Sequence, residues 1–318
     1  MKAAVLVGPR AFEIREVPLP EPGAGEVRVR VESCGVCASN IPPYEGRPWF
    51  DYPMPPGALG HEACGRVDAL GPEVEGKWEV GQRVAFLSQH GYAEYDVASE
   101  RAMVALPPAL DHQQIPGEPV ACAINIFKRS GIKKGDLVAV VGVGFLGALL
   151  IQLAVSAGAR VFALSRRGSA LDIGRSFGAG EAVPLECRET ALAHLRQATS
   201  GSFCDVVIEA TGKQAPLQFA SEITKERGRL VIAGYHQDGE RQINLQLWNW
   251  RGLDVINAHE RDPEIYMQGM REGVKAMENG YLAVEPLLTH HLPLERLDDA
   301  LELARERPEG FMKALIRV

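Results

Sequence analysis

The sequence predicts an α/β protein that combines a doubly wound parallel sheet with a second, mainly-β domain. Two observations predict this combination. Short alternating runs broken by Pro and Gly extend to about residue 123, and apolar strands exchange with amphipathic helices from about 124 to 258. Alternation of apolar and polar residues is typical of half-buried strands. Strands that alternate with helices along the chain favour a parallel sheet covered by helices on both faces. At 318 residues the chain is long enough for two domains with a core each.

The first region contains alternating runs at 26–33 and 61–70, as expected for strands of a barrel-like β domain. Pro and Gly cluster at 19–26 and 52–60 and mark the turns between runs. After about residue 260 the pattern predicts helices over 266–280 and 297–306 and a closing strand over 313–318.

The second region predicts the alternating elements of a parallel sheet. Apolar runs indicate strands at 137–144, 159–165, 204–212, 228–235 and 253–259, and helical patterns fall at 145–158 and 171–179. We find no internal repeat and no low-complexity segment.

Composition excludes several classes of function. The net charge of −7 and the absence of a long Lys/Arg run argue against a nucleic-acid partner. The first residues enter a strand pattern without a signal core, and no apolar stretch reaches membrane-spanning length. Six irregularly spaced cysteines fit a reducing compartment better than a disulfide framework. We therefore expect a cytoplasmic protein that does not act on a membrane.

A glycine-rich turn predicts a dinucleotide site. Gly142, Gly144 and Gly147 form G-x-G-x-x-G between an apolar strand and a helix, which is the context that gives this short motif meaning. Gly142 allows the tight turn, Gly144 lets the backbone approach a pyrophosphate, and Gly147 lets helix and strand pack closely. With Phe145 and Leu146, these residues would bring the pyrophosphate to the positive end of the helix dipole.

The residues after the second strand of this region favour NADP(H) over NAD(H). An NAD enzyme usually has an acidic residue about 20 positions after the glycines, bonded to the ribose 2′-hydroxyl. Here Ser165 is followed by Arg166 and Arg167, and a hydroxyl with two guanidiniums can bind a 2′-phosphate. The alternative is that both arginines lie on an ordinary solvated loop.

Three segments carry residue types that bind zinc. Cys37 lies in GVCASN, His61 in GHEACG and Cys122 in GEPVACA, and a catalytic zinc usually has three protein ligands with one position open. Taken singly, each is more often a buried structural residue than a ligand. Cys34 forms a C-x-x-C with Cys37, which a redox pair or a zinc knuckle would also have, but no second C-x-x-C follows and we predict core packing for Cys34.

Five motifs occur in a fixed order along the chain: GVCASN, GHEACGRV, GQRV, EPVACA and VVGVGFLG. In these motifs and along nearly its whole length, the chain resembles the zinc-containing alcohol dehydrogenase branch of the medium-chain dehydrogenase/reductase superfamily. The resemblance implies a GroES-like catalytic domain (1–123, completed by 259–318) and a Rossmann domain (124–258). It implies that Cys37, His61 and Cys122 bind zinc. Glu62 would contact these ligands without binding the metal, or act as an exchangeable fourth ligand. Ser39 would contact the substrate oxygen.

The resemblance also suggests further contacts. Thr211, Gly212 and Gly234 follow later strands and would line the cofactor, and Lys313 matches a basic residue near the pyrophosphate. Many relatives carry a cysteine-rich lobe after the G-x-R-V strand, but residues 81–100 contain no cysteine, so we predict one catalytic zinc and no structural zinc. A homodimer or homotetramer through the strand at 253–259, which Trp248 and Trp250 precede, is expected because strand edges tend to be paired.

Two residues depart from the family pattern. Asn40 stands where relatives have Asp, and Pro42 where they often have the His of a proton relay. We expect Asn40 to accept a hydrogen bond from the zinc-bound histidine without raising its basicity, which predicts weaker zinc retention. His90 and Tyr92 are the remaining relay candidates, and Trp49, Phe50 and Tyr52 lie where relatives line the substrate pocket or else anchor the core.

Three functional hypotheses follow. The favoured one is a zinc-dependent oxidoreductase that transfers hydride between NADP(H) and an alcohol or carbonyl substrate, with the metal as Lewis acid. A zinc-free quinone or enoyl reductase of the same superfamily has no reason to keep three ligands. A non-catalytic NADPH-binding protein would fit the loss of relay residues.

Overall fold

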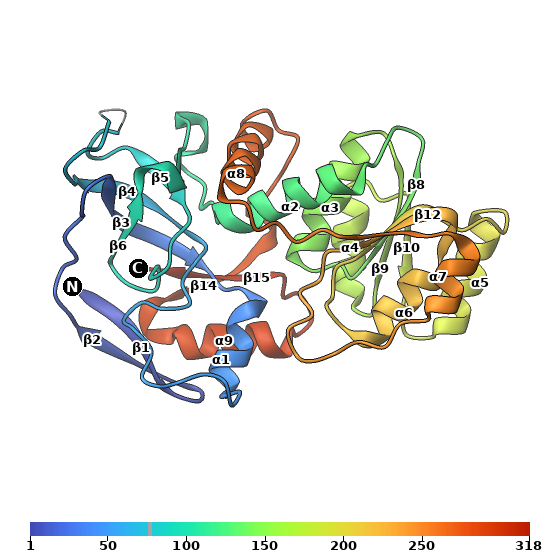
Figure 1. The fold of residues 1–318 in the computed structure, drawn as a ribbon, viewed down its shortest axis with the longest axis horizontal. Coiled ribbons are helices and arrows are strands. Elements are labelled where there is room, and N and C mark those ends of the chain that lie inside the picture. The colour runs from blue at the N-terminus through green and yellow to red at the C-terminus, as the bar shows by residue number, and fades with distance from the viewer. Residues whose placement is uncertain (76–77) are drawn as a thin grey trace. The chain divides into compact units, whose positions relative to one another are not determined.

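The computed structural model describes residues 1–75 and 78–318, and the chain forms two compact units (Figure 1). Unit 1 comprises Met1–Ala121, Met267–Gly280 and Val284–Val318. Unit 2 comprises Cys122–Tyr266 and Tyr281–Ala283. The fold matches the predicted class: a mainly-β unit and a doubly wound parallel sheet.

Unit 1 is built on a seven-stranded sheet in the order β14-β15-β3-β4-β5-β7, with β6 also paired to β3. The sheet is antiparallel except between β14 and β15. These strands are β3 (Glu26–Gly35), β4 (Ala63–Leu70), β5 (Arg83–Phe86), β6 (Tyr95–Ser99), β7 (Met103–Ala105), β14 (Leu288–Pro293) and β15 (Lys313–Arg317). A separate antiparallel pair joins β1 (Lys2–Gly8) to β2 (Ala11–Glu16).

Alternation along β3 builds the core of unit 1. Val27, Val29 and Val31 are buried in one cluster with residues of β4, β5 and the C-terminal segment, while Arg30 is exposed. Leu315 of β15 pairs with Gly35 of β3, so the last strand joins the sheet that the first region begins. The short helices of unit 1 are α1 (Ile41–Glu45), α9 (Leu297–Glu306) and the 3-10 turns η1 (Ala38–Asn40), η2 (Glu100–Ala102), η3 (Pro108–Leu110), η4 (Glu285–Leu287) and η5 (Leu294–Arg296).

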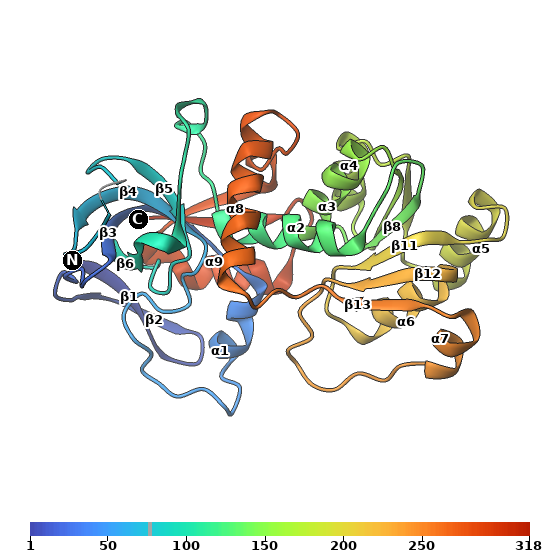
Figure 2. The ribbon, with the colours of Figure 1, turned by 45° about the horizontal axis from the view of Figure 1, so that its top comes forward.

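Unit 2 contains a six-stranded parallel sheet in the order β10-β9-β8-β11-β12-β13. In Figure 2 the strands β11, β12 and β13 lie in succession toward the edge. The strands are β8 (Leu137–Val141), β9 (Arg160–Ser165), β10 (Glu181–Pro184), β11 (Cys204–Glu209), β12 (Thr224–Ile232) and β13 (Asp254–Asn257). The intervening helices are α3 (Phe145–Ser156), α4 (Gly168–Ser176), α5 (Arg188–Ala198), α6 (Gln214–Glu222) and α7 (Leu245–Arg251).

Helices cover both faces of this sheet because its central strands β8, β9 and β11 are mostly apolar and buried. Phe162 and Leu164 pack into one cluster with residues of α5 and α6. Ala163, which points to the opposite face, contacts α4, where a Cβ added at Gly174 would lie 2.7 Å from the Ala163 Cβ. Burial on both faces is the pattern expected of a doubly wound sheet.

Not every helix was predicted from the sequence: α5, α6 and α7 were missed, and so was the helix that carries EPVACA. The segment EPVACA lies in α2 (Gly117–Ser130), which crosses the expected domain boundary at residue 123. Pro119 is tolerated because the first turn of a helix has no intrahelical acceptor for its missing N–H. The remaining long helix is α8 (Pro263–Glu278). Within the described residues, no helix combines the length and apolarity needed to cross a membrane.

Candidate metal centre and dinucleotide edge

Cys37, His61 and Glu62 place one ligand atom each within 4.8 Å of one another in unit 1. Cys37 is the N-cap of η1, directly after β3, and its thiol sulfur accepts from the Ser39 N–H at 3.5 Å. His61 and Glu62 immediately precede β4, the neighbour of β3 in the sheet. A thiolate sulfur, an imidazole nitrogen and a carboxylate oxygen form a donor set that fits zinc.

The ring of His61 is oriented by a main-chain carbonyl. His61 Nδ1 lies 2.9 Å from the Leu59 carbonyl oxygen, and because a carbonyl only accepts, Nδ1 carries the proton and Nε2 is left as the ligand nitrogen. The expectation that Asn40 accepts from this histidine is wrong. Asn40 Nδ2 donates to the same Leu59 oxygen at 2.9 Å, and Asn40 Oδ1 accepts from the Cys37 N–H at 3.1 Å.

The electrostatics of this group favour positive charge. Burial tends to lower the pKa of His61, whereas its hydrogen bond to Cys37 raises it. The charges of Cys37, Glu118 and Glu62 raise the pKa of His61 further, to about 10. The metal-free group therefore attracts a cation, whether a proton or a metal ion.

Glu62 has a second partner, the ammonium of Lys313. The Lys313 Nζ lies 2.8 Å from Glu62 Oε1 and 2.6 Å from Oε2, and both side chains are buried. Burial lowers the pKa of Lys313, but the charges of Glu62, Cys37 and Glu118 and the hydrogen bond to Glu62 together outweigh burial, so the pKa is raised. Gly35 leaves the space, since a Cβ there would lie 2.0 Å from Glu62 Oε2 and 2.9 Å from Lys313 Cε. The Lys313 ammonium is thus paired with a buried carboxylate, and its predicted place near the pyrophosphate stays a prediction.

The glycine-rich turn after β8 has the geometry that its motif predicts. Gly142 has φ of +103°, and a Cβ there would lie 2.4 Å from Thr211 Cγ2. A Cβ at Gly147 would lie 2.0 Å from the Gly142 carbonyl oxygen, whereas one at Gly144, the N-cap of α3, meets no atom within 4 Å. The space at Gly144 lies at the N-terminus of α3, where Phe145 and Leu146 begin the helix and an anion is stabilised.

Ser165 ends β9, the neighbour of β8, as the sequence predicts. Its hydroxyl accepts from the Arg167 N–H at 3.2 Å, and the Arg167 guanidinium donates to the Val143 carbonyl at 3.5 Å. Arg166 is exposed. This strand end therefore presents a hydroxyl and two guanidiniums and no carboxylate of its own.

Comparison with known proteins decides the family. A model of the alcohol dehydrogenase GroES-like domain matches residues 23–108, and a model of the zinc-binding dehydrogenase matches residues 146–272. The chain belongs to the zinc-containing alcohol dehydrogenases of the medium-chain dehydrogenase/reductase superfamily.

Relatives of this alcohol dehydrogenase align along almost its whole length. Sorbitol dehydrogenase of Halalkalibacterium halodurans is 26% identical, over 94% of this chain and 95% of its own. Erythritol/L-threitol dehydrogenase of Mycolicibacterium smegmatis is 27% identical, over 99% and 97%. The crystal structure of 2R,3R-butanediol dehydrogenase from Bacillus subtilis superposes with a TM-score of 0.86 at 26% identity, covering 100% of this chain and 99% of the other.

Cys122 has a different neighbour from the other two candidate ligands of the dehydrogenase. It belongs to unit 2, where its sulfur lies 2.7 Å from the Tyr266 hydroxyl. Its role as third zinc ligand stays a prediction. Cys34 is fully buried in the core of unit 1, which confirms it as a packing residue.

Sequence reasoning missed Glu118. This residue lies in the first turn of α2, within unit 1, and its charge raises the pKa of both His61 and Lys313. The signal was present in the Glu-Pro pair at the start of EPVACA, since an acidic residue before a proline is typical of a helix N-terminus. Glu118 therefore adds a second carboxylate to the electrostatic surroundings of the metal centre.

Each relay candidate of the dehydrogenase has polar partners of its own in unit 1. Tyr92 is fully buried, its hydroxyl lies 3.1 Å from Asn40 Oδ1 and 3.2 Å from the Gly35 carbonyl, and burial raises its pKa well above the usual value. His90 Nδ1 lies 3.6 Å from Asp96 Oδ1, and the hydrogen bond to Asp96 raises the pKa of His90.

The three aromatic residues of the loop before GHEACG differ in their surroundings. The Tyr52 hydroxyl donates to the Pro43 carbonyl and its ring packs against the core of unit 1. Trp49 is exposed and lies beside Phe50. Tyr52 is therefore an anchor of the loop, and Trp49 is the aromatic that remains accessible.

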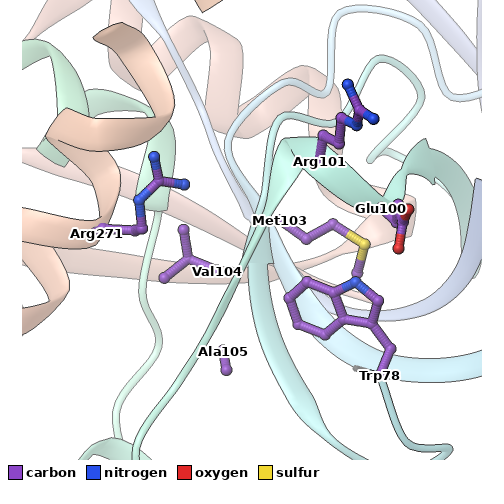
Figure 3. A pocket seen from close by; sticks show the side chains of 7 residues that line it. All are labelled: Trp78, Glu100, Arg101, Met103, Val104, Ala105 and Arg271. Carbon is purple, nitrogen blue, oxygen red and sulfur yellow. The ribbon is translucent and has the colours of Figure 1, made fainter. Parts of the chain in front are cut away.

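A separate hollow of about 350 Å³ lies in unit 1 (Figure 3). Trp78, Glu100 and residues of β7 line it together with Arg101 and Arg271. It contains none of the residues predicted to bind zinc or the dinucleotide, so we do not connect it with alcohol oxidation.

Proposed function

We propose that this enzyme oxidises a small polyol or vicinal diol to the hydroxyketone, or reduces the hydroxyketone, with NADP(H) and one catalytic zinc. The observation that carries the proposal is the convergence of Cys37, His61 and Glu62 in a chain of the zinc-containing alcohol dehydrogenase family. Relatives along its full length are named for sorbitol, erythritol or threitol, and butanediol, which supports a substrate with neighbouring hydroxyls.

The residues that would hold the ion are Cys37, His61 and Glu62, a choice that differs from the sequence prediction by placing Glu62 where Cys122 was expected. Bound there, zinc supplies a Lewis acid for the substrate oxygen. The Leu59 carbonyl keeps the His61 proton on Nδ1 and so keeps Nε2 available as a ligand atom.

Ser39 is the residue of this chain best suited to move the alcohol proton. It lies two residues after Cys37 on η1, is partly exposed, and its hydroxyl has no hydrogen-bond partner among the described residues. A hydroxyl in this position can accept the proton of a substrate alcohol while it donates its own hydroxyl proton to another group. With Pro42 unable to relay a proton, we propose that Ser39 passes it to water.

The choice of NADP(H) rests on the end of β9. A 2′-phosphate carries about two negative charges, which Ser165 can accommodate by donating its hydroxyl and Arg166 and Arg167 by charge-assisted bonds. An NAD-preferring site would have a carboxylate at Ser165. Thr211 and Gly234, at the ends of the next strands, complete the proposed cofactor edge together with Gly142, Gly144 and Gly147.

We assign residues 1–123, completed by 259–318, to the catalytic domain, and 124–258 to the dinucleotide-binding domain. The pairing of β15 with β3 supports the return of the C-terminal segment to the first sheet. The cysteine-free stretch 81–100 supports the absence of a structural zinc. Edge strand β13 and the exposed Trp250 support assembly into homodimers or homotetramers.

The test is a substrate screen on protein whose zinc content is known. We expect one zinc per chain and polyol- or diol-dependent formation of NADPH that the Cys37→Ser variant loses. Zinc-loaded protein that oxidises none of the alcohols with either dinucleotide would contradict the proposal. A preference for NAD in kcat/KM would contradict only its cofactor part.

A further inference from the structure

Glu209 is a buried carboxylate at the carboxyl end of β11, and it has 0% exposure. Its Oε1 accepts from the Thr211 N–H at 2.7 Å, the Gly212 N–H at 2.9 Å and the Thr211 hydroxyl. Its Oε2 accepts from His236 Nε2 at 2.9 Å. A buried charge is stable only when its hydrogen bonds are satisfied, so Glu209 requires both the turn after β11 and the loop after β12.

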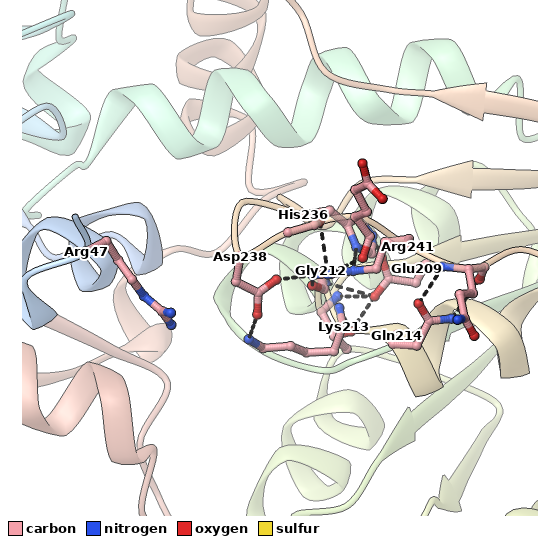
Figure 4. Close-up of polar contacts among 12 residues, drawn as sticks. Arg47, Glu209, Gly212, Lys213, Gln214, His236, Asp238 and Arg241 are labelled. Atoms are coloured by element: carbon pink, nitrogen blue, oxygen red, sulfur yellow. Dashed lines mark hydrogen bonds and ion pairs between the residues drawn. The ribbon is translucent and has the colours of Figure 1, made fainter. Parts of the chain in front are cut away.

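His236 links this carboxylate to Arg241 (Figure 4). The Arg241 Nε donates to His236 Nδ1 at 2.8 Å, and because Nδ1 accepts, the imidazole proton lies on Nε2 and points to Glu209. Arg241 also donates to the Gly212 carbonyl at 2.9 Å and to Asp238. The imidazole thus serves as donor and acceptor at once, between two fixed partners.

The two segments that His236 joins approach each other through their backbones. Gly212 has φ of +70°, and a Cβ there would lie 2.5 Å from the Tyr235 carbonyl oxygen. A Cβ at Gly234 would lie 2.1 Å from the Gly212 nitrogen and 2.7 Å from Glu209 Oε2. Only glycine fits at either position, so the backbones after β11 and β12 approach closely at the point where the Glu209 carboxylate accepts hydrogen bonds from both segments.

These ends lie at the edge of the sheet where nucleotides bind in open α/β folds, outside the carboxyl ends of the strands. Thr211 contacts Gly142 of the glycine-rich turn, which extends the connected backbone across the ends of β8, β11 and β12. Tertiary contacts made by Glu209 therefore reach the segment expected to hold the pyrophosphate.

We propose that His236 is a positioning residue for the nicotinamide dinucleotide: it fastens the loop after β12 to Glu209 and so sets the cofactor-facing edge formed by Thr211, Gly212 and Gly234. His236 does not touch the reacting atoms. The inference rests on the proposed function, since it presupposes that this edge receives NADP(H).

The outer part of the network offers a matched control. Lys213 Nζ pairs with Asp238 Oδ2 at 2.7 Å, but the lysine side chain is 65% exposed, and exposed pairs contribute little. Removing the charge of Lys213 leaves the bonds of His236 to Glu209 and Arg241 intact.

The experiment measures the dissociation constant of NADPH, by fluorescence titration, for zinc-loaded wild type and three variants. His236→Leu removes both hydrogen bonds and should weaken NADPH binding roughly tenfold, in the range measured for coupled polar networks. His236→Gln presents an amide donor and a carbonyl acceptor and should restore binding to within about threefold of wild type. Lys213→Gln should leave it unchanged. Zinc content and the KM for the alcohol should be the same in all four proteins.

A double-mutant cycle identifies the partner. Glu209→Gln turns a donor toward the His236 Nε2–H, so His236→Leu should cost much less in the Glu209→Gln background than alone. The inference is overturned if His236→Leu binds NADPH as tightly as wild type, or if its loss of binding is not rescued by His236→Gln. Wild-type protein that binds neither NADPH nor NADH would instead refute the proposed function.

Discussion

Lys313 Nζ lies 2.6 Å from Glu62 Oε2, and the two side chains are 6% and 1% exposed. One partner of this buried ion pair is thus also a candidate zinc ligand. A buried charge without its partner destabilises a fold by several kcal/mol, whereas a bound cation can take the place of the missing ammonium. Stability and metal binding are therefore linked through Glu62.

We predict that Lys313→Met lowers the free energy of unfolding of the metal-free protein by about 3 kcal/mol. Because zinc neutralises the unpaired Glu62, the same variant should be stabilised more by zinc than wild type is. Urea denaturation with and without zinc measures both effects. The double variant Glu62→Gln with Lys313→Met is the control, and it should lose less stability than Lys313→Met alone.

The ligand set is decided by comparing two conservative variants. We expect Glu62→Gln to weaken zinc binding by at least about tenfold, because a neutral amide replaces a charged ligand. Cys122→Ser should retain zinc, since the sulfur has the Tyr266 hydroxyl as its neighbour. Chelator competition on purified protein gives both affinities. The opposite pattern, with zinc lost in Cys122→Ser and kept in Glu62→Gln, would restore the set expected from sequence.

Most of the fold was predictable from local patterns. The alternation of Val27, Val29 and Val31 indicates a strand buried on one face, and the continuous apolar run of β8 indicates a strand buried on both faces. Helix α2 was missed because the motif EPVACA, which lies in its first turns, was assigned to the mainly-β region that extends to about residue 123. A motif names residues that recur together, but it does not state which element carries them.

The partners of the site residues were not predictable in the same way. Glu62 and Lys313 are 251 positions apart, and only the pairing of β15 with β3 brings the lysine beside the carboxylate. Likewise, nothing in GVCASN reveals that the Leu59 carbonyl accepts a hydrogen bond from His61 Nδ1 and another from Asn40 Nδ2. Sequence patterns identified the chemical types, whereas long-range pairing determined which groups meet.

We predict that Asn40→Asp destabilises the enzyme and, contrary to the expectation from sequence, does not improve zinc retention. Asn40 is 2% exposed and donates Nδ2–H to the Leu59 carbonyl, a bond that a carboxylate cannot make. An ionised Asp would face that carbonyl oxygen with no proton, at a cost of about 2 kcal/mol. Thermal unfolding and zinc loss to a chelator measure the two effects.

Tyr92→Phe is the matched control for Asn40→Asp. It removes the hydroxyl that neighbours Asn40 Oδ1 but leaves the bond to Leu59 in place, so its cost should be nearer 1 kcal/mol. Improved zinc retention in Asn40→Asp would mean that the aspartate of relatives strengthens this centre despite the lost bond.

Cofactor preference should respond to a single charge at the end of β9. Ser165→Asp places a carboxylate where the 2′-phosphate is proposed to bind, and loss of a charge-assisted bond is worth about 1.5–3 kcal/mol. We therefore expect kcat/KM with NADP to fall between about tenfold and a hundredfold, while kcat/KM with NAD is unchanged or rises.

Ser165→Asn is the control for this charge, because it adds bulk without a negative charge and should retain the preference for NADP. Initial rates with both cofactors at saturating alcohol measure the ratio. An unchanged ratio in Ser165→Asp would show that this strand end does not contact the ribose phosphate.

Trp250 tests the proposed assembly. It is 87% exposed on α7, which also carries Leu245 at 54% exposure, and α7 leads into β13, the edge strand of the parallel sheet. An exposed aromatic beside an unpaired edge is typical of an interface anchor. Trp250→Glu should cost about 2 kcal/mol of association, which raises the dimer dissociation constant roughly thirtyfold. Sedimentation equilibrium measures that constant. Tyr281→Glu, an exposed aromatic outside α7 and β13, should leave it unchanged, and a dimer equally tight in Trp250→Glu would place the interface elsewhere.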